Sequence, residues 1–198
     1  TTKTAALTNA GALSNQGTVT VGVDDTGYDV KFFGATSGAY MLWDESADDL
    51  MLVGAAGLSV AGDISTPSAG TSNFRAGVNA GNSIASGGNY NTVVGDEAGT
   101  AITTGDHNVA LGYAALTAED AHGYNTAIGG RSLATLNAGA DGYNTAVGYD
   151  SGRAMTTGIQ NTLIGGLAGD AITTGSYNSV VGVNAGGAIT TGAQNVAV

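Results

Sequence analysis

The chain has 198 residues, of which 34 are glycine, one is proline and none is cysteine. Five basic residues against 16 acidic ones give a formal net charge of -11, which argues against nucleic acid as a partner because nucleic-acid-binding surfaces are basic. The lack of cysteine excludes a disulfide framework and a thiolate metal site. No apolar run approaches the roughly 18 residues of a membrane-spanning helix, so we expect no membrane insertion.

The first third of the chain predicts an arm, a small β-structure and a linker. Residues 1–17 are rich in Thr, Ala, Asn and Ser and predict an extended arm or linker. Residues 18–64 predict an antiparallel β-meander, because short apolar runs alternate with Gly- and Asp-containing turns. This block contains the only Trp and two of the three Phe residues, so we expect it to hold the denser core. Residues 65–72 include the only Pro and are interpreted as a linker. The expected strands are residues 18–23, 28–33, 39–43, 50–53 and 57–64.

Residues 73–198 repeat a short phrase with a period near 17 residues. Each clear copy starts with Asn and reaches Gly four residues later, as in Asn161-Thr-Leu-Ile-Gly165. A fixed period of this length, held over many copies, indicates a repeat architecture. The repeated positions are Asn91, Asn108, Asn125, Asn144, Asn161, Asn178 and Asn195, and Gly95, Gly112, Gly129, Gly148, Gly165 and Gly182.

Such a short, Gly-rich repeat predicts one coil of a parallel β-solenoid, with two short strands joined by two tight turns. The recurrent Gly should adopt a positive φ or let two backbones approach closely. The recurrent Asn should form an internal hydrogen-bonded ladder or occupy a left-handed turn. So thin a core buries little surface, and either stacking many coils or wrapping three chains about one axis would add burial. The second arrangement suits a fibre, so we expect a homotrimer.

Two aliphatic columns are expected to point into this core. One lies three residues after each Asn, and the other belongs to the second strand of each coil. The first column is Val94, Leu111, Ile128, Val147, Ile164, Val181 and Val198, and the second is Ile102, Met155, Ile172 and Ile189.

Two adjacent coils depart from the pattern. The copy from Asn125 to Tyr143 is two residues longer than the others, and the copy before it carries Leu116-Thr-Ala-Glu-Asp-Ala-His122 in place of Ala-Ile-Thr-Thr-Gly. An insertion usually bulges from a corner, so a side loop or partner contact is predicted here, although relaxed packing explains the pattern equally well. The last copy stops at Val198, and we expect the sequence to be part of a longer polypeptide.

A row of planar side chains directly precedes the repeated Asn residues. These rings could stack against the sugars of a host-surface glycan, or they could stack on one another or pack between chains, which is the favoured interpretation. The row consists of Tyr90, His107, Tyr124, Tyr143 and Tyr177, with Gln160 and Gln194 at the remaining positions.

Little in the sequence predicts catalysis or a bound ion. There are two histidines and no cysteine, so we expect neither enzymatic activity nor a cofactor. The densest acidic cluster is a weak candidate for Ca²⁺, but its spacing does not match an EF-hand loop and a solvated turn is favoured. It comprises Asp44, Glu45, Asp48 and Asp49.

Two stretches resemble known families. The repeated Asn-Thr/Ser phrase, with its Ala-Gly and Thr-Gly corners, resembles the head repeats of trimeric autotransporter adhesins, which are left-handed parallel β-rolls in trimers. Residues 29–50, followed by Gly/Asn/Thr repeats, resemble bacteriophage virion structural proteins, especially tail fibres. Neither resemblance brings catalytic residues.

The resemblances imply a homotrimeric virion component that holds a rod shape, contacts other virion proteins and contributes to attachment to host-surface glycan or protein. The alternative is the head of a bacterial trimeric adhesin. A third hypothesis is an ice-binding solenoid, suggested by a column of Thr pairs. It is less favoured because adjacent Thr side chains point to opposite faces, which leaves one per coil outward. The pairs are Thr103-Thr104, Thr156-Thr157, Thr173-Thr174 and Thr190-Thr191.

Overall fold

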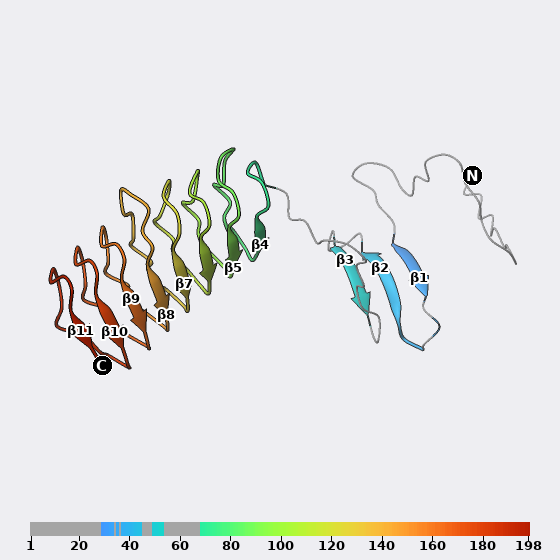
Figure 1. The fold of residues 1–198 in the computed structure, drawn as a ribbon. Coiled ribbons are helices and arrows are strands. Elements are labelled where there is room, and N and C mark those ends of the chain that lie inside the picture. Colours follow the sequence, from blue (N-terminus) through green and yellow to red (C-terminus); the bar gives the residue numbers. More distant parts are fainter. Residues whose placement is uncertain (1–28, 34, 36, 45–48, 54–67) are drawn as a thin grey trace, which may run out of the picture. The chain divides into compact units, whose positions relative to one another are not determined.

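The computed structural model describes residues 29–33, 35, 37–44, 49–53 and 68–198. The chain divides into two units, Thr1–Asp63 and Ile64–Val198. Within the described residues every element is a strand, with one antiparallel sheet and one parallel sheet (Figure 1). The predicted all-β class, with an antiparallel meander followed by a parallel solenoid, is therefore confirmed.

The first unit contains a three-stranded antiparallel sheet in the order β1-β2-β3. Val30 pairs with Trp43 across the first two strands, and Tyr40 pairs with Val53 across the last two. These strands match three of the five expected ones, while the predictions at residues 18–23 and 57–64 lie outside the described residues. The strands are β1 (Val30–Phe33), β2 (Tyr40–Asp44) and β3 (Asp49–Val53).

This sheet does not hold the denser core that its aromatic content predicts. Among its described side chains only Ala39 and Leu42 are buried, whereas Trp43 and Phe33 are exposed. A single sheet has two faces, and an apolar face is buried only when a second layer packs on it. No second layer is found among the described residues of this unit, so the expectation was wrong for them.

The second unit is a solenoid whose coils each contribute one strand to an eight-stranded parallel sheet (Figure 1). Neighbouring strands are consecutive in the sequence, and the register repeats the sequence period, with Thr162 beside Ser179 and Ile164 beside Val181. The strands are β4 (Phe74–Ala76), β5 (Thr92–Val94), β6 (Val109–Leu111), β7 (Thr126–Ile128), β8 (Thr145–Val147), β9 (Thr162–Ile164), β10 (Ser179–Val181) and β11 (Val196–Ala197).

The second strand expected in each coil is absent from the described solenoid. The Ala-Ile-Thr-Thr segment consists of turns, although its backbone still bonds from coil to coil, as in Thr173 N–H to the Thr190 carbonyl at 2.8 Å. Positive-φ residues such as Asn184 and Gly186 recur along each coil and interrupt an extended chain. The inward column of this segment is nevertheless confirmed, since Ile102 and Met155 are fully buried.

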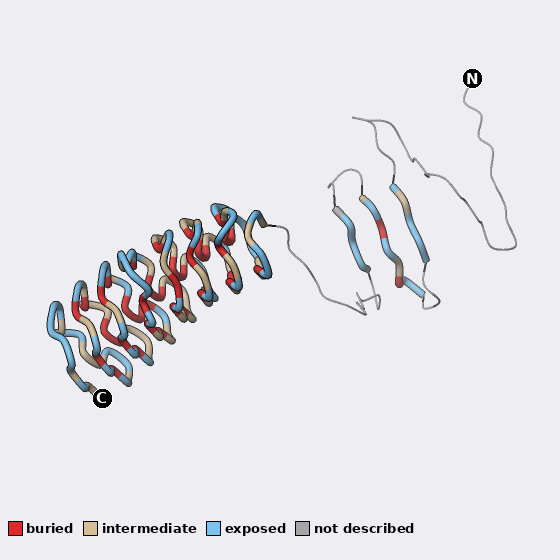
Figure 2. The backbone as a smooth tube through the Cα atoms, turned by 45° about the horizontal axis from the view of Figure 1, so that its top comes forward, coloured by how far each residue is buried: buried red, intermediate tan, exposed pale blue. Residues whose placement is uncertain are grey.

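The inward strand position is two residues after each Asn, not three as expected. Because side chains alternate across a strand, the central residue points inward and its two neighbours point outward. The outward neighbours include Leu111, Ile164 and Val181, which are 44, 41 and 42% exposed. Figure 2 shows buried positions recurring from coil to coil in the middle of the solenoid, from β5 to β10. The fully buried strand residues are Val93, Ala110, Ala127, Ala146, Leu163 and Val180.

Candidate functional surfaces of the solenoid

The repeated Asn residues form an internal ladder along the solenoid. The backbone N–H of Asn178 donates to Oδ1 of Asn161 at 2.9 Å, and the backbone N–H of Asn161 donates to Oδ1 of Asn144 at the same distance. Nδ2 of Asn161 also donates to the Gly175 carbonyl at 3.0 Å. The ladder alternative is therefore confirmed, and the left-handed turn falls on the preceding residue, as in Tyr177 with φ 61°.

All the repeated Gly residues from Gly95 to Gly165 satisfy both reasons expected for them. Gly112 has φ 130°, and a Cβ placed there would lie 2.7 Å from the carbonyl carbon of Gly129 in the next coil. No real Cβ makes such a contact, so the corner needs Gly for its conformation and for its spacing. Gly182 has the same conformation with φ 131°, but its nearest neighbour would be the Ala185 Cβ at 3.5 Å.

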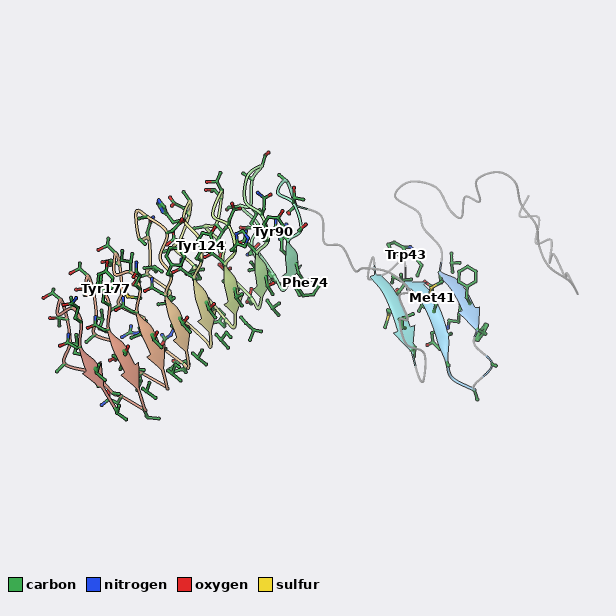
Figure 3. All side chains as sticks on the ribbon, in the orientation of Figure 1. Met41, Trp43, Phe74, Tyr90, Tyr124 and Tyr177 are labelled. Atoms are coloured by element: carbon green, nitrogen blue, oxygen red, sulfur yellow. The ribbon has the colours of Figure 1, made fainter. Side chains whose placement is uncertain are left out.

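The ring residues of the predicted row stack on one another over four coils. Ring centroids are 4.9 Å apart for Tyr90 and His107, 5.1 Å for His107 and Tyr124, and 4.8 Å for Tyr124 and Tyr143. Tyr177 is separated from this stack by Gln160, although it follows the same line along the solenoid (Figure 3). Because the inner ring faces are occupied, the stack presents ring edges and hydroxyl groups to solvent, and sugar stacking on those inner faces is disfavoured.

The solvent-facing side of the solenoid sheet carries two regular columns of side chains, which together we call the outer face. Its first column, one residue after each Asn, is mainly Thr, and its second column is aliphatic. None of these side chains carries a charge, and Phe74 at the first strand points to the same side (Figure 3). The outer face consists of Thr92, Val109, Thr126, Thr145, Thr162 and Ser179 together with Val94, Leu111, Ile128, Val147, Ile164 and Val181.

The Thr pairs of the turn segments contribute hydrogen bonds between neighbouring coils. The hydroxyl of Thr156 donates to the Thr173 carbonyl, and that of Thr173 donates to the Thr190 carbonyl, each at 3.2 Å. The second Thr of each pair, such as Thr174, is exposed. The Thr pairs therefore expose one column of Thr side chains to solvent. The Thr-x-aliphatic columns lie elsewhere, on the outer face.

The acidic cluster of the first unit is described only in part. Asp44 pairs with Asp49 at the end of the β2–β3 ladder, which places both at the expected turn. Glu45 and Asp48 lie outside the described residues. The weak Ca²⁺ prediction therefore gains no support.

A different polar cluster lies in the two irregular coils. Glu119 is fully buried, and its Oε1 lies 3.3 Å from Nδ1 of His122, while its Oε2 accepts the backbone N–H of Ala138 in the next coil at 3.2 Å. Asp120 is the neighbouring acidic residue, and one ligand atom from each of these three side chains falls within 4.8 Å of the others. The sequence pattern marks this segment as irregular but does not single out Glu119, because burial of a carboxylate has no local sequence signal.

Burial raises the pKa of Glu119, and backbone hydrogen bonds from Ala138 and His122 oppose the rise. A carboxyl whose pKa is higher in the folded state stabilises the fold most below its unfolded pKa and loses that contribution as the pH rises. We therefore expect the stability of Glu119→Gln relative to wild type to increase as the pH rises above about 4.5. Urea unfolding of both proteins from pH 4 to pH 8, in chelator, measures this difference. A constant difference would contradict the expectation.

Comparisons with known proteins identify no relative of the chain. No protein-family model, curated protein or solved structure matches the chain. Within the part of the chain that the structure describes, no helix has the length and apolarity needed to cross a membrane.

Proposed function

We propose that the chain is a structural component of a virion, part of a tail fibre or similar appendage, and that it assembles as a homotrimer. The observation that carries the proposal is the outer face of the solenoid, where uncharged Thr and aliphatic side chains continue from coil to coil. Exposed apolar patches of this regularity mark interaction surfaces. A trimer would cover this face and supply the burial that the thin interior lacks.

The spacing of the outer face favours a second copy of the chain as its partner. Successive coils are separated by the inter-strand distance of about 4.8 Å, so a partner must present apolar groups at the same interval over many coils. Another solenoid of the same sequence meets that condition by symmetry, because closed rings of identical chains are the usual form of homo-oligomers. The rod would then join other virion proteins along the appendage.

Contact with the host is proposed along the Tyr90–Tyr143 stack. Ring edges and phenolic hydroxyls there can hydrogen-bond to a glycan or to a host protein. In a trimer each stack occurs three times, so weak contacts would combine through avidity. The mechanism is mechanical and multivalent, and it assigns no catalytic residue.

Charges on the outer face are expected to prevent assembly without unfolding a coil. The double variant Leu111→Lys/Ile164→Lys should sediment near 19.2 kDa, because desolvating two ammonium groups per chain in an apolar interface is costly. The control Gln160→Lys/Gln194→Lys adds the same charge at exposed corner positions and should keep the assembled mass. Circular dichroism checks that both variants retain β-structure. Equal masses for the two variants would contradict the proposed interface.

Two other functions remain to be tested. An adhesin head would use the same trimer, and an antibody raised against the chain would then label the bacterial surface instead of virus particles. Ice binding is favoured by one observation, the regular Thr-x-aliphatic columns of the outer face. Thermal hysteresis in a monomeric preparation would support ice binding, and its absence would reject it.

A further inference from the structure

We propose that Glu119, Asp120 and His122 form a binding site for a divalent transition-metal ion such as Zn²⁺, located where the two irregular coils meet. The site goes beyond the rod function proposed above. It depends on side chains that replace the regular repeat in one coil.

The distance between the two buried ligand atoms fits one ion. Nδ1 of His122 and Oε1 of Glu119 are 3.3 Å apart. Two ligands of a tetrahedral Zn²⁺, each about 2.0–2.1 Å from the ion, are separated by about 3.3–3.4 Å. The third ligand atom, from Asp120, lies within 4.8 Å of both, so a modest side-chain rotation would complete three protein ligands and leave the fourth position for water.

The nitrogen atom of this same pair gives a second reason to expect a ligand. Nδ1 of His122 is buried and makes no hydrogen bond with acceptable geometry to any described residue, although it is directed at the Glu119 carboxylate. Buried polar atoms are nearly always satisfied, and an orphan often marks an ion or water. An ion between the nitrogen and Oε1 would satisfy both atoms at once.

The surroundings hold the ligands in place. The backbone N–H of Ala138 donates to Oε2 of Glu119, and the backbone N–H of His122 donates to Oε1 at 3.3 Å. The carboxylate is therefore fixed from both coils, and Oε1 keeps a second lone pair for an ion. The longer coil, which contains Ala138, also contributes Asp141, whose Oδ1 accepts the N–H of Gly123 at 3.1 Å. Hydrogen bonds of this kind orient metal ligands. A bound ion would therefore fasten the inserted residues to the preceding coil.

Calorimetric titration of the full chain with ZnCl₂ at pH 7.5, after removal of metal with chelator, tests the site. We expect one ion per chain, and a rise in Tm of about 5 °C at a hundredfold excess of Zn²⁺ over Kd. His122→Gln should weaken binding at least tenfold. His107→Gln, which changes the only other histidine, should leave binding unchanged.

Co²⁺ gives a second readout that does not depend on stability. A four-coordinate site with a histidine should produce an intense visible absorption band in wild type and in His107→Gln, and this band should be lost in Glu119→Gln. Absence of stoichiometric Zn²⁺ binding in wild type would overturn the proposal and leave an ordinary His–Glu ion pair. Equal binding by His122→Gln would also overturn it, because the ion would then be held by scattered acidic groups.

Discussion

Gly112→Ala is expected to lower the free energy of unfolding of the solenoid by about 4 kcal/mol or more, placing it among the most damaging single substitutions. The added Cβ would lie 2.7 and 2.8 Å from the carbonyl carbon and oxygen of Gly129, and both atoms belong to a hydrogen-bonded backbone that cannot move alone. The positive φ of 130° adds about 1–3 kcal/mol of conformational strain. Urea unfolding followed by circular dichroism measures the loss.

Gly182→Ala is the matched control, because its φ of 131° is the same and its added Cβ would meet nothing closer than 3.5 Å. Its free energy of unfolding should fall only by the conformational strain of the positive φ, about 1–3 kcal/mol. The difference between the two variants isolates the close approach of neighbouring coils. Equal losses would contradict the packing described for this corner.

Asn161→Ala is expected to lower the free energy of unfolding by about 3–5 kcal/mol, since it removes a fully buried link of the ladder. The substitution leaves the backbone N–H of Asn178 without its acceptor, Oδ1 of Asn161 at 2.9 Å. It also leaves the Gly175 carbonyl without its donor, Nδ2 of Asn161 at 3.0 Å. Each buried group left unsatisfied costs about 1–3 kcal/mol, and a side-chain cavity adds to the loss. Thermal and urea unfolding measure the change.

Asn195→Ala provides the comparison within the same ladder. Asn195 is only partly buried, and its side chain donates through Nδ2 to Oδ1 of Asn178 at 2.9 Å. Water can replace that bond, so a loss of about 1 kcal/mol or less is expected. If Asn161→Ala were as mild as Asn195→Ala, the ladder would not be a principal source of stability.

The sequence predicts the solenoid well because its period is set by backbone geometry. Gly112 and its equivalents are spaced by the coil length, and a single residue type meets both the φ and the contact requirement. Asn161 and its equivalents predict either a ladder or a left-handed turn, and the structure selects the ladder, in which a buried amide side chain donates and accepts along the stack. These signals are local and recur in each copy.

Side-chain direction was harder to predict, as the aliphatic column shows. Ile164 and Leu163 are both apolar, so hydrophobicity alone does not decide which one points inward. A strand of three residues gives too short an alternation to fix its phase. The central position also tolerates Ala, as in Ala127 and Ala146, and this small residue masks the core column in the sequence.

The Glu119 cluster could not be derived for another reason. Its partners come from two coils, with Ala138 in the longer one, and the register between those coils follows from the inserted residues. A sequence pattern marks the irregularity but not the contact. The Tyr90–His107 stack, by contrast, follows directly once the coils are known to stack in register.

Sedimentation equilibrium of the wild-type chain measures whether it forms the proposed trimer, because the proposed function depends on a covered outer face. We expect a mass near three times 19.2 kDa that persists on dilution to low micromolar concentration. A mass of 19.2 kDa at all concentrations would contradict it, showing that the outer face stays exposed to water and that the solenoid is complete as a single chain.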